Sequence, residues 1–414
     1  MEECPRPSRR HRWAALLLGA WPALAAASAS PACIEALLRE LGWRIEPAAE
    51  VADMHVGQPC TRASLADAHA AGDLRLLLPA DIDAEGREAA LRQALASEGT
   101  LCAYLFALGD STRRATARLQ DNPGYRFSAL QLGWIGFGPG GARAQGWRRF
   151  RSFGRGYEPA GSNARALDAF YSGRVRSECG VGRQVAQLAT QRELYGDDGF
   201  DAEFDAGELS IGTFLTLHGT DSILLGRNAG EFLADGKAAR TAAMGRQAFM
   251  GAPGAIVHAY DRILLDDVHN QAENFVVADV DEAAARALEE HGGLAHYDRL
   301  NQRIWSLARE MRRGDPPDFL ALLHDRDEAA RAALDEADRA RVAQLDALLA
   351  DPFYTGFRVY VHRQGVRPIG YHVVRLLDLN PRTPYTVELM LHNLHTTLYR
   401  RWIEHRLRRC AASD

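Results

Sequence analysis

The chain has 414 residues, of which 47% are hydrophobic and 25% charged, an ordinary globular composition with material for two or three domains. The formal net charge of −5 argues against a nucleic-acid-binding protein, for which a basic chain would be expected. Beyond the N-terminal region, no run is apolar over the roughly 20 residues that span a bilayer, so we expect no stable membrane insertion.

The first 29 residues have the pattern of a cleaved export signal. A basic stretch from Arg6 to Arg12 precedes an apolar run from Trp13 to Ala27, and small residues suited to signal peptidase follow. The apolar run is short and contains Pro22, which favours a signal peptide over a membrane anchor. We therefore expect a mature chain that starts near Ser30 and is periplasmic or secreted.

An exported chain places its cysteines in an oxidising compartment, where exposed thiols pair. Five cysteines remain after cleavage of the signal that contains Cys4, so one of them is left without an intramolecular partner. Counting alone leaves the connectivity open. The members of this set are Cys33, Cys60, Cys102, Cys179 and Cys410.

Taken in chain order, residues 30–149 read as a helical accessory region, with a clear helical pattern from Cys33 to Leu41. Residues 150–313 combine helices with short β-branched runs that end at Gly or Asp, typical of strands. The expected strands are Glu208 to Leu217, Gly254 to His258 and Asn274 to Asp279. We therefore predict an α+β fold.

Residues 314–414 are expected to form a C-terminal helical region with a hairpin. A strongly helical stretch runs from Asp318 to Leu349. The predicted hairpin joins Phe357–His362 to Tyr371–Leu376, and an amphipathic helix from Val387 to Cys410 closes the chain.

Cys179 is the candidate nucleophile because it is followed by Gly180-Val-Gly182 and then by a helical stretch from Arg183 to Leu194, which places the thiol at a helix N-terminus. At a helix N-terminus, unpaired amides and the macrodipole stabilise a thiolate and lower the cysteine pKa. The competing interpretation is an inert cysteine beside a helix, in a disulfide-stabilised binding or envelope protein. The helix context alone leaves both interpretations open.

Two motifs resemble the bacterial spore-coat protein-glutamine gamma-glutamyltransferases. The first is Arg174-Val-Arg-Ser-Glu-Cys-Gly-Val-Gly182, in which a Glu-Cys pair opens a helix. The second is Asn270-Gln-Ala-Glu-Asn-Phe-Val-Val277, in which a Glu-Asn pair opens a hydrophobic strand. The resemblance covers about Ser162 to Asp279 and implies a papain-like core related to NlpC/P60 proteins.

By this resemblance Cys179 is the nucleophile, and therefore the cysteine that we expect to be free, with Glu273 its partner and Glu178 an adjacent acid. The implied reaction is attack of the thiol on a glutamine carboxamide, followed by transfer of the acyl group to a lysine amine or to water. The implied partners are a protein or peptide with an accessible glutamine and an amine donor. Moving the proton from an ordinary thiol to an ordinary glutamate costs about 6 kcal/mol, so the site should be recessed to shift both pKa values.

A papain-like cysteine peptidase or amidase is the alternative, with a histidine as the base. His258, in a predicted strand after the nucleophile helix, is the best placed of four candidates, which also include His269, His291 and His296.

We expect no cofactor and no metal. Glu388, His392 and His395 have the spacing of ligands on one helix face, but a solvated or packing face is the preferred interpretation. The acidic cluster from Asp197 to Asp205 departs from the calcium-loop pattern and is interpreted as a solvated loop. The arginines and aromatic residues from Trp147 to Tyr157 are interpreted as the rim of a site for an anionic or peptide substrate.

Overall fold

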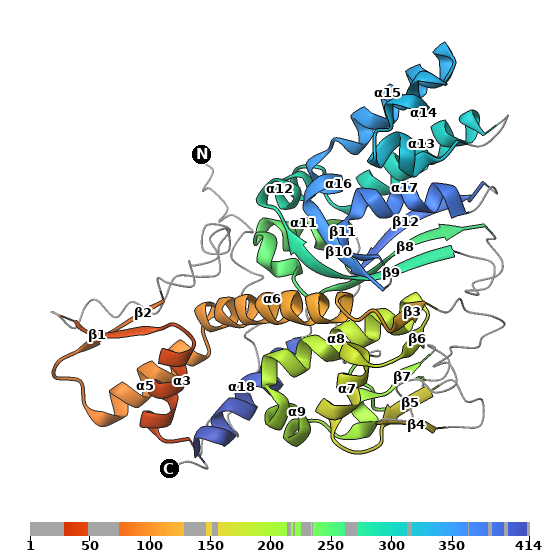
Figure 1. The fold of residues 1–414 in the computed structure, drawn as a ribbon. Coiled ribbons are helices and arrows are strands. Elements are labelled where there is room, and N and C mark those ends of the chain that lie inside the picture. The colour runs from red at the N-terminus through yellow and green to blue at the C-terminus, as the bar shows by residue number, and fades with distance from the viewer. Residues whose placement is uncertain are drawn as a thin grey trace, which may run out of the picture. The chain divides into compact units, whose positions relative to one another are not determined.

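The computed structural model describes most of the chain from Ala29 to Ala411. The described residues are 29–48, 74–127, 146–150, 156–212, 217, 220–224, 233, 235–260, 271–312, 317–362, 364–379, 383–392 and 396–411. Within them helices and strands are mixed, as expected for an α+β protein (Figure 1). The predicted export signal lies outside the described residues except for Ala29.

The chain divides into two compact units. The terminal unit combines Met1–Tyr104 with Tyr399–Asp414, and the central unit is Leu105–Leu398. A boundary near Gly314 was expected, but one hydrophobic core contains Trp305 and Met311 before it and Phe319 and Leu345 after it. Packing across this position makes residues on both sides part of one unit.

The terminal unit pairs two short parallel strands with helices. Ser30 caps the first helix by accepting a hydrogen bond from the Cys33 amide at 3.2 Å, and Pro31 opens that helix. The region was expected to be helical, so its two strands are an addition. Its elements are α3 (Pro31–Glu40), β1 (Arg44–Ala48), β2 (Arg75–Pro79), α5 (Ala84–Leu95), and parts of α6 (Glu98–Gln120) and α18 (Thr396–Ala411).

A disulfide between Cys33 and Cys410 joins the two chain segments of the terminal unit, with a Cα–Cα distance of 5.5 Å. In the same unit, the ring of Tyr104 lies 5.0 Å from that of Tyr399 and 5.3 Å from that of Trp402. The covalent link spans 377 positions in the sequence, so it holds the end of the chain to its first described helix.

The central unit is built on a five-stranded antiparallel sheet in the order β11-β10-β9-β8-β12. The strands β8 and β9 confirm the predicted strands at Gly254–His258 and Asn274–Asp279. The bounds are β8 (Pro253–Ala259), β9 (Gln271–Val280), β10 (Phe357–Val361), β11 (Gly365–Pro368) and β12 (Thr386–Leu391).

Helices cover both faces of this sheet (Figure 1). On one face lies α8 (Cys179–Tyr195), which packs against β9. The other face carries most of the hydrophobic core and is covered by α12 (Glu282–Glu290), α13 (Leu294–Met311), α16 (Pro352–Gly356) and α17 (Ile369–Leu379).

Smaller elements complete the central unit. Two short sheets pair β3 (Tyr125–Phe127) with β6 (Val175–Ser177), and β4 (Trp147–Phe150) with β5 (Gly156–Pro159) and β7 (Ile211–Gly212). The helical elements that remain are α7 (Asn163–Ser172), α9 (Asp197–Glu203), η5 (Ala206–Leu209), α11 (Asp235–Ala243), η7 (Arg246–Phe249), η8 (Leu320–His324), α14 (Glu328–Ala332) and α15 (Glu336–Leu349).

Two predictions for the C-terminal region were wrong. Tyr371–Leu376 is part of the helix α17, and the hairpin partner of β10 is β11. Val387–Leu391 belongs to β12, which pairs with β8, so the final helix begins only at Thr396. Alternating burial along β12 was missed because its apolar residues also fit a helical spacing over a short window.

Candidate active site

Cys179 is the first residue of α8, as the sequence predicted. Glu178 is the N-cap of this helix, and its carboxylate accepts hydrogen bonds from the amides of Gly180 at 2.5 Å and Val181 at 2.6 Å. A carboxylate at this position satisfies two helix amides and interacts favourably with the helix dipole. The capping hydrogen bonds of Glu178 therefore fix the position of the Glu178–Cys179 pair at the start of α8.

The sulfur of Cys179 lies against the edge of strand β9. Its contacts are the carbonyl oxygen of Ala272 at 3.4 Å and the side-chain amide of Asn274, which donates to Sγ at 3.4 Å. The neighbouring strand β10 pairs with β9 only between Val276 and Val280. The first residues of β9 are therefore not paired with β10, and their backbone can contact the thiol.

Among the described cysteines, Cys179 is the one with a free thiol. Cys33 and Cys410 are bonded to each other, and Cys102 is disulfide-bonded as well. This confirms the expectation, drawn from the motif that contains Cys179, that this cysteine is the unpaired one.

The electrostatic setting of the thiol differs from the expectation. Burial raises the pKa of Cys179 to about 11, and the nearby charge of Glu178 acts in the same direction. The amide of Asn274 opposes this shift, and the thiol also hydrogen-bonds to Glu178. Desolvation therefore outweighs the Asn274 amide, and a thiol with this pKa is protonated at neutral pH.

Glu178 shares this environment. Burial raises the pKa of its carboxyl group above the usual value, although the amides of Gly180 and Val181 act against the shift. The carboxyl group and the thiol are in hydrogen-bond contact, so a proton can pass between them, but the raised pKa of Cys179 increases the free energy that this transfer costs.

Glu273 follows Ala272 in β9, but its side chain points to the other face of the sheet, because successive side chains of a strand alternate. It is 3% exposed and accepts a hydrogen bond from Nδ1 of His372 at 2.8 Å. It also forms an ion pair with Arg375. Between Glu273 and Cys179, both within the described residues, no hydrogen bond is present.

His372 and Arg375 stand one turn apart on α17. Burial lowers the pKa of His372 to about 3, so its imidazole is neutral and donates to the carboxylate. The positive charge of Arg375 would be attracted to a thiolate at Cys179. Through Arg375, the buried carboxylate of Glu273 is connected electrostatically to the thiol.

His258 lies in β8 on the same face of the sheet as Glu273, since its neighbour Ile256 pairs directly with Glu273. Its ring packs at 5.3 Å from that of Trp305, and burial lowers its pKa to about 4. The structure does not bring His258 together with Cys179, whose contacts come from the opposite face.

The other histidines proposed as bases are also separate from the thiol contacts. His291 and His296 stack on each other, with ring centroids 3.9 Å apart. His269 lies outside the described residues.

Sequence reasoning missed three residues of this site: Asn274, His372 and Arg375. Asn274 could have been found, since it follows Glu273 in the quoted motif and the alternation of a strand turns it to the face opposite Glu273. His372 and Arg375 were hidden because the stretch around them was assigned to a strand, where residues three apart do not share a face.

The weaker sequence signals take other structures. Glu388 lies in β12 and His392 just beyond it, so the expected helix face does not exist there, and His395 is outside the described residues. Asp197 begins the helix α9 and pairs with Arg192 at 2.8 Å, where a solvated loop was expected. In the Arg-rich aromatic segment, Trp147 is buried and donates to the Ala166 carbonyl at 2.7 Å.

Comparison of the chain with protein-family models, with curated proteins and with solved structures found no match. Of the helices in the described ranges, none combines the length and the apolar character needed to cross a membrane.

Proposed function

We propose that this chain is an exported cysteine acyltransferase that acts on glutamine side chains of proteins, with Cys179 as the nucleophile. The observation that carries the proposal is a free, partly buried thiol at the start of a helix, held against a strand edge and hydrogen-bonded to a carboxylate. A cysteine at the start of a helix that packs on an antiparallel sheet is also what a papain-like core requires, which supports that fold as part of the proposal.

In the proposed reaction the Sγ of Cys179 attacks the carboxamide carbon of a glutamine. The C–N bond breaks, ammonia leaves with the thiol proton, and a thioester remains on the enzyme. A lysine amine then displaces the sulfur to form an isopeptide bond, or water does so to form glutamate. The thiol is regenerated in either case, and no cofactor is needed.

The geometry supports a division of roles between the two glutamates. Glu178 is the carboxylate in hydrogen-bond contact with the thiol, so we assign to it the transfer of the thiol proton. Glu273 holds Arg375, whose positive charge favours the thiolate once it forms. This assignment replaces the direct Cys179–Glu273 pair that the resemblance implies.

Export remains part of the proposal and rests on the N-terminal pattern and on the disulfide between Cys33 and Cys410, since structural disulfides persist in oxidising compartments. Determination of the N-terminal residue of the protein from its native host tests it. A chain that retains Met1 or the Arg6–Arg12 stretch would contradict cleavage.

Incorporation of a labelled primary amine into a glutamine-rich protein tests the proposed activity. We expect Cys179→Ala to abolish incorporation and Glu178→Gln to reduce it by about 100-fold or more, since general-base catalysis contributes on the order of 100 to 10,000-fold. Glu273→Gln should reduce it less, by about tenfold, because its effect acts through Arg375.

Glu193→Gln is the matched control, since Glu193 lies near the other end of the same helix and pairs with the exposed side chains of Arg114 and Arg118. It should leave incorporation within about twofold of the wild type. Incorporation that survives Cys179→Ala, or a wild-type protein that neither incorporates amine nor releases ammonia, would show the proposal to be wrong.

A further inference from the structure

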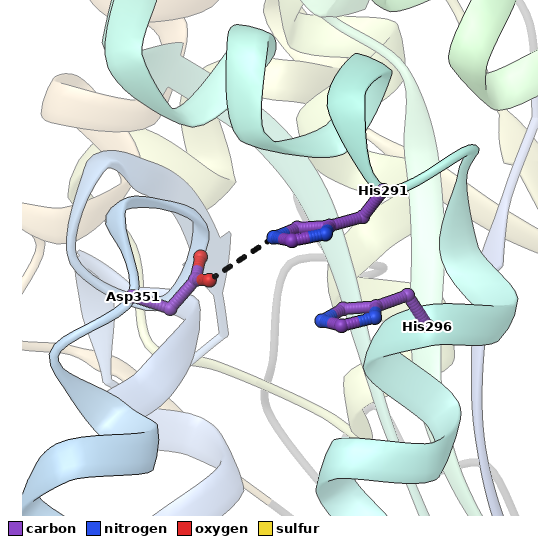
Figure 2. Close-up of side chains that lie close together, drawn as sticks. All are labelled: His291, His296 and Asp351. Carbon is purple, nitrogen blue, oxygen red and sulfur yellow. Dashed lines mark ion pairs between the residues drawn. The ribbon is translucent and has the colours of Figure 1, made fainter.

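Three potential metal ligands from separate parts of the sequence meet at one place in the central unit (Figure 2). His291 is the C-cap of α12, His296 lies in the first turn of α13, and Asp351 is the N-cap of α16. One ligand atom from each lies within 4.8 Å of the other two. This is the one such group of three found among the described residues.

The turn between α12 and α13 brings the two histidines together. Gly292 and Gly293 both adopt positive φ, at 80° and 121°, which favours glycine and lets the chain reverse within two residues. The imidazole rings consequently stack almost in parallel, with an angle of 5° between their planes.

Asp351 is oriented by its own neighbours. Its Oδ1 accepts hydrogen bonds from the Phe353 amide at 2.8 Å and the Tyr297 hydroxyl at 3.1 Å. Its Oδ2 is directed to Nε2 of His291 at 3.8 Å. Hydrogen bonds of this kind fix ligating carboxylates in metal sites, and here they leave one oxygen for a ligand.

We propose that His291, His296 and Asp351 bind a divalent transition-metal ion of the zinc type. Two imidazole nitrogens and one carboxylate oxygen form a donor set that zinc accepts, with bonds of about 2.0–2.2 Å. Tetrahedral ligation at that bond length places ligand atoms about 3.4 Å apart, so separations of up to 4.8 Å must shorten and the stacked rings must turn when the ion binds. The side chain of His291 is 39% exposed, so the site can be reached from solvent.

The site differs from what the sequence suggested. Asp351 is separated from His291 by 60 positions, so no spacing rule connects them.

The mixed nitrogen and oxygen donors favour zinc-like ions over Mg²⁺ and Ca²⁺, which prefer oxygen ligands.

Equilibrium dialysis of the full chain, free of affinity tags, against Zn²⁺ tests the proposal. We expect one saturable site per chain whose affinity falls at least tenfold in each of His291→Ala, His296→Ala and Asp351→Asn. Asparagine retains the helix-capping function of Asp351, so the last variant removes a ligand charge and preserves the cap. Co²⁺ should produce the visible absorption of a low-symmetry site in the wild type and not in the variants.

His324→Ala is the control, because His324 is another exposed histidine paired with an aspartate, Asp325, at 2.8 Å. It should leave zinc binding unchanged. Absence of a saturable zinc site in the wild type would overturn the proposal, and so would a site that persists in both His291→Ala and His296→Ala or that disappears in His324→Ala.

Discussion

At the scale of single residues, the central feature is a thiol whose surroundings disfavour its reactive form. The Asn274 amide stabilises the thiolate, whereas burial and Glu178 destabilise it, and the second pair prevails. Under the proposed function, these surroundings would keep Cys179 protonated until a substrate is bound.

Alkylation of Cys179 should depend steeply on pH. With a pKa of about 11, the thiolate fraction rises about tenfold per pH unit from pH 7 to pH 10, whereas an ordinary thiol levels off near pH 9. The rate constant for iodoacetamide, followed by mass spectrometry of the Cys179 peptide, measures this.

Glu178→Gln supplies the internal comparison, because it removes a negative charge that raises the thiol pKa. We expect faster alkylation at pH 8 in this variant, even though it should transfer acyl groups more slowly. A wild-type profile that levels off at pH 8–9 would contradict the environment described for the thiol.

At the scale of elements, the packing of α8 against its neighbours depends on Gly182. A Cβ at this position would meet the Cβ of His362, at the end of β10. The ring of His362 is held in turn by stacking on Tyr125, with centroids 4.0 Å apart. Gly182 thus lets the helix that carries Cys179 approach the sheet closely.

Gly182→Ala should therefore destabilise the central unit by about 1–3 kcal/mol, the usual cost of overpacking. Urea unfolding measures the change. Gly161→Ala is the control, since a Cβ there has no neighbour within 4 Å, and it should change stability by no more than about 0.5 kcal/mol. Equal effects of the two substitutions would refute the close contact.

Helices and strands that are set by their own local sequence were predicted correctly. Those that depend on contacts with distant parts of the chain were not. The helix start at Cys179 follows from its cap, and β8 and β9 follow from β-branched runs bounded by turns. The stretch that forms α17 was predicted as a strand, and the stretch that forms β12 was predicted as part of a helix. Both are short and apolar, so only their packing neighbours decide between a helical and a strand pattern.

In the candidate site, too, the residues close together in the sequence were predicted, and those brought together by the fold were not. Local sequence identified Cys179 and Glu178, which lie within one helix turn of each other. The face to which Glu273 points, and its partners on α17, required the sheet and its covering helices to be known.

At the scale of the whole molecule, stability should depend on pH through buried histidines. The pKa of His258 is lowered to about 4 in the folded chain, against a usual value of about 6.5. The unfolded chain therefore binds one more proton than the folded chain between these values. The contribution of His258 to stability is complete above pH 6.5 and is lost as the pH falls toward 4.

His258→Gln tests this dependence by removing the titrating group. Between pH 6.5 and 5 the free energy of unfolding of the wild type should fall more steeply than that of the variant, by up to about 1.4 kcal/mol per pH unit. Hydrogen exchange of the β8 and β9 amides, measured across this range, reports the difference for the central unit. Identical slopes would show that His258 is not held neutral by burial.

The central claim is that Cys179 forms a thioester with glutamine side chains, and trapping that intermediate tests it most directly. The protein is incubated with a glutamine-containing peptide in the absence of added amine, quenched in acid, and analysed by intact mass and peptide mapping. The account predicts an adduct with the mass of the peptide minus ammonia, attached to Cys179, released by hydroxylamine and absent from Cys179→Ala. A Cys179 peptide that stays unmodified across a range of glutamine peptides, or that is recovered as a disulfide, would contradict it.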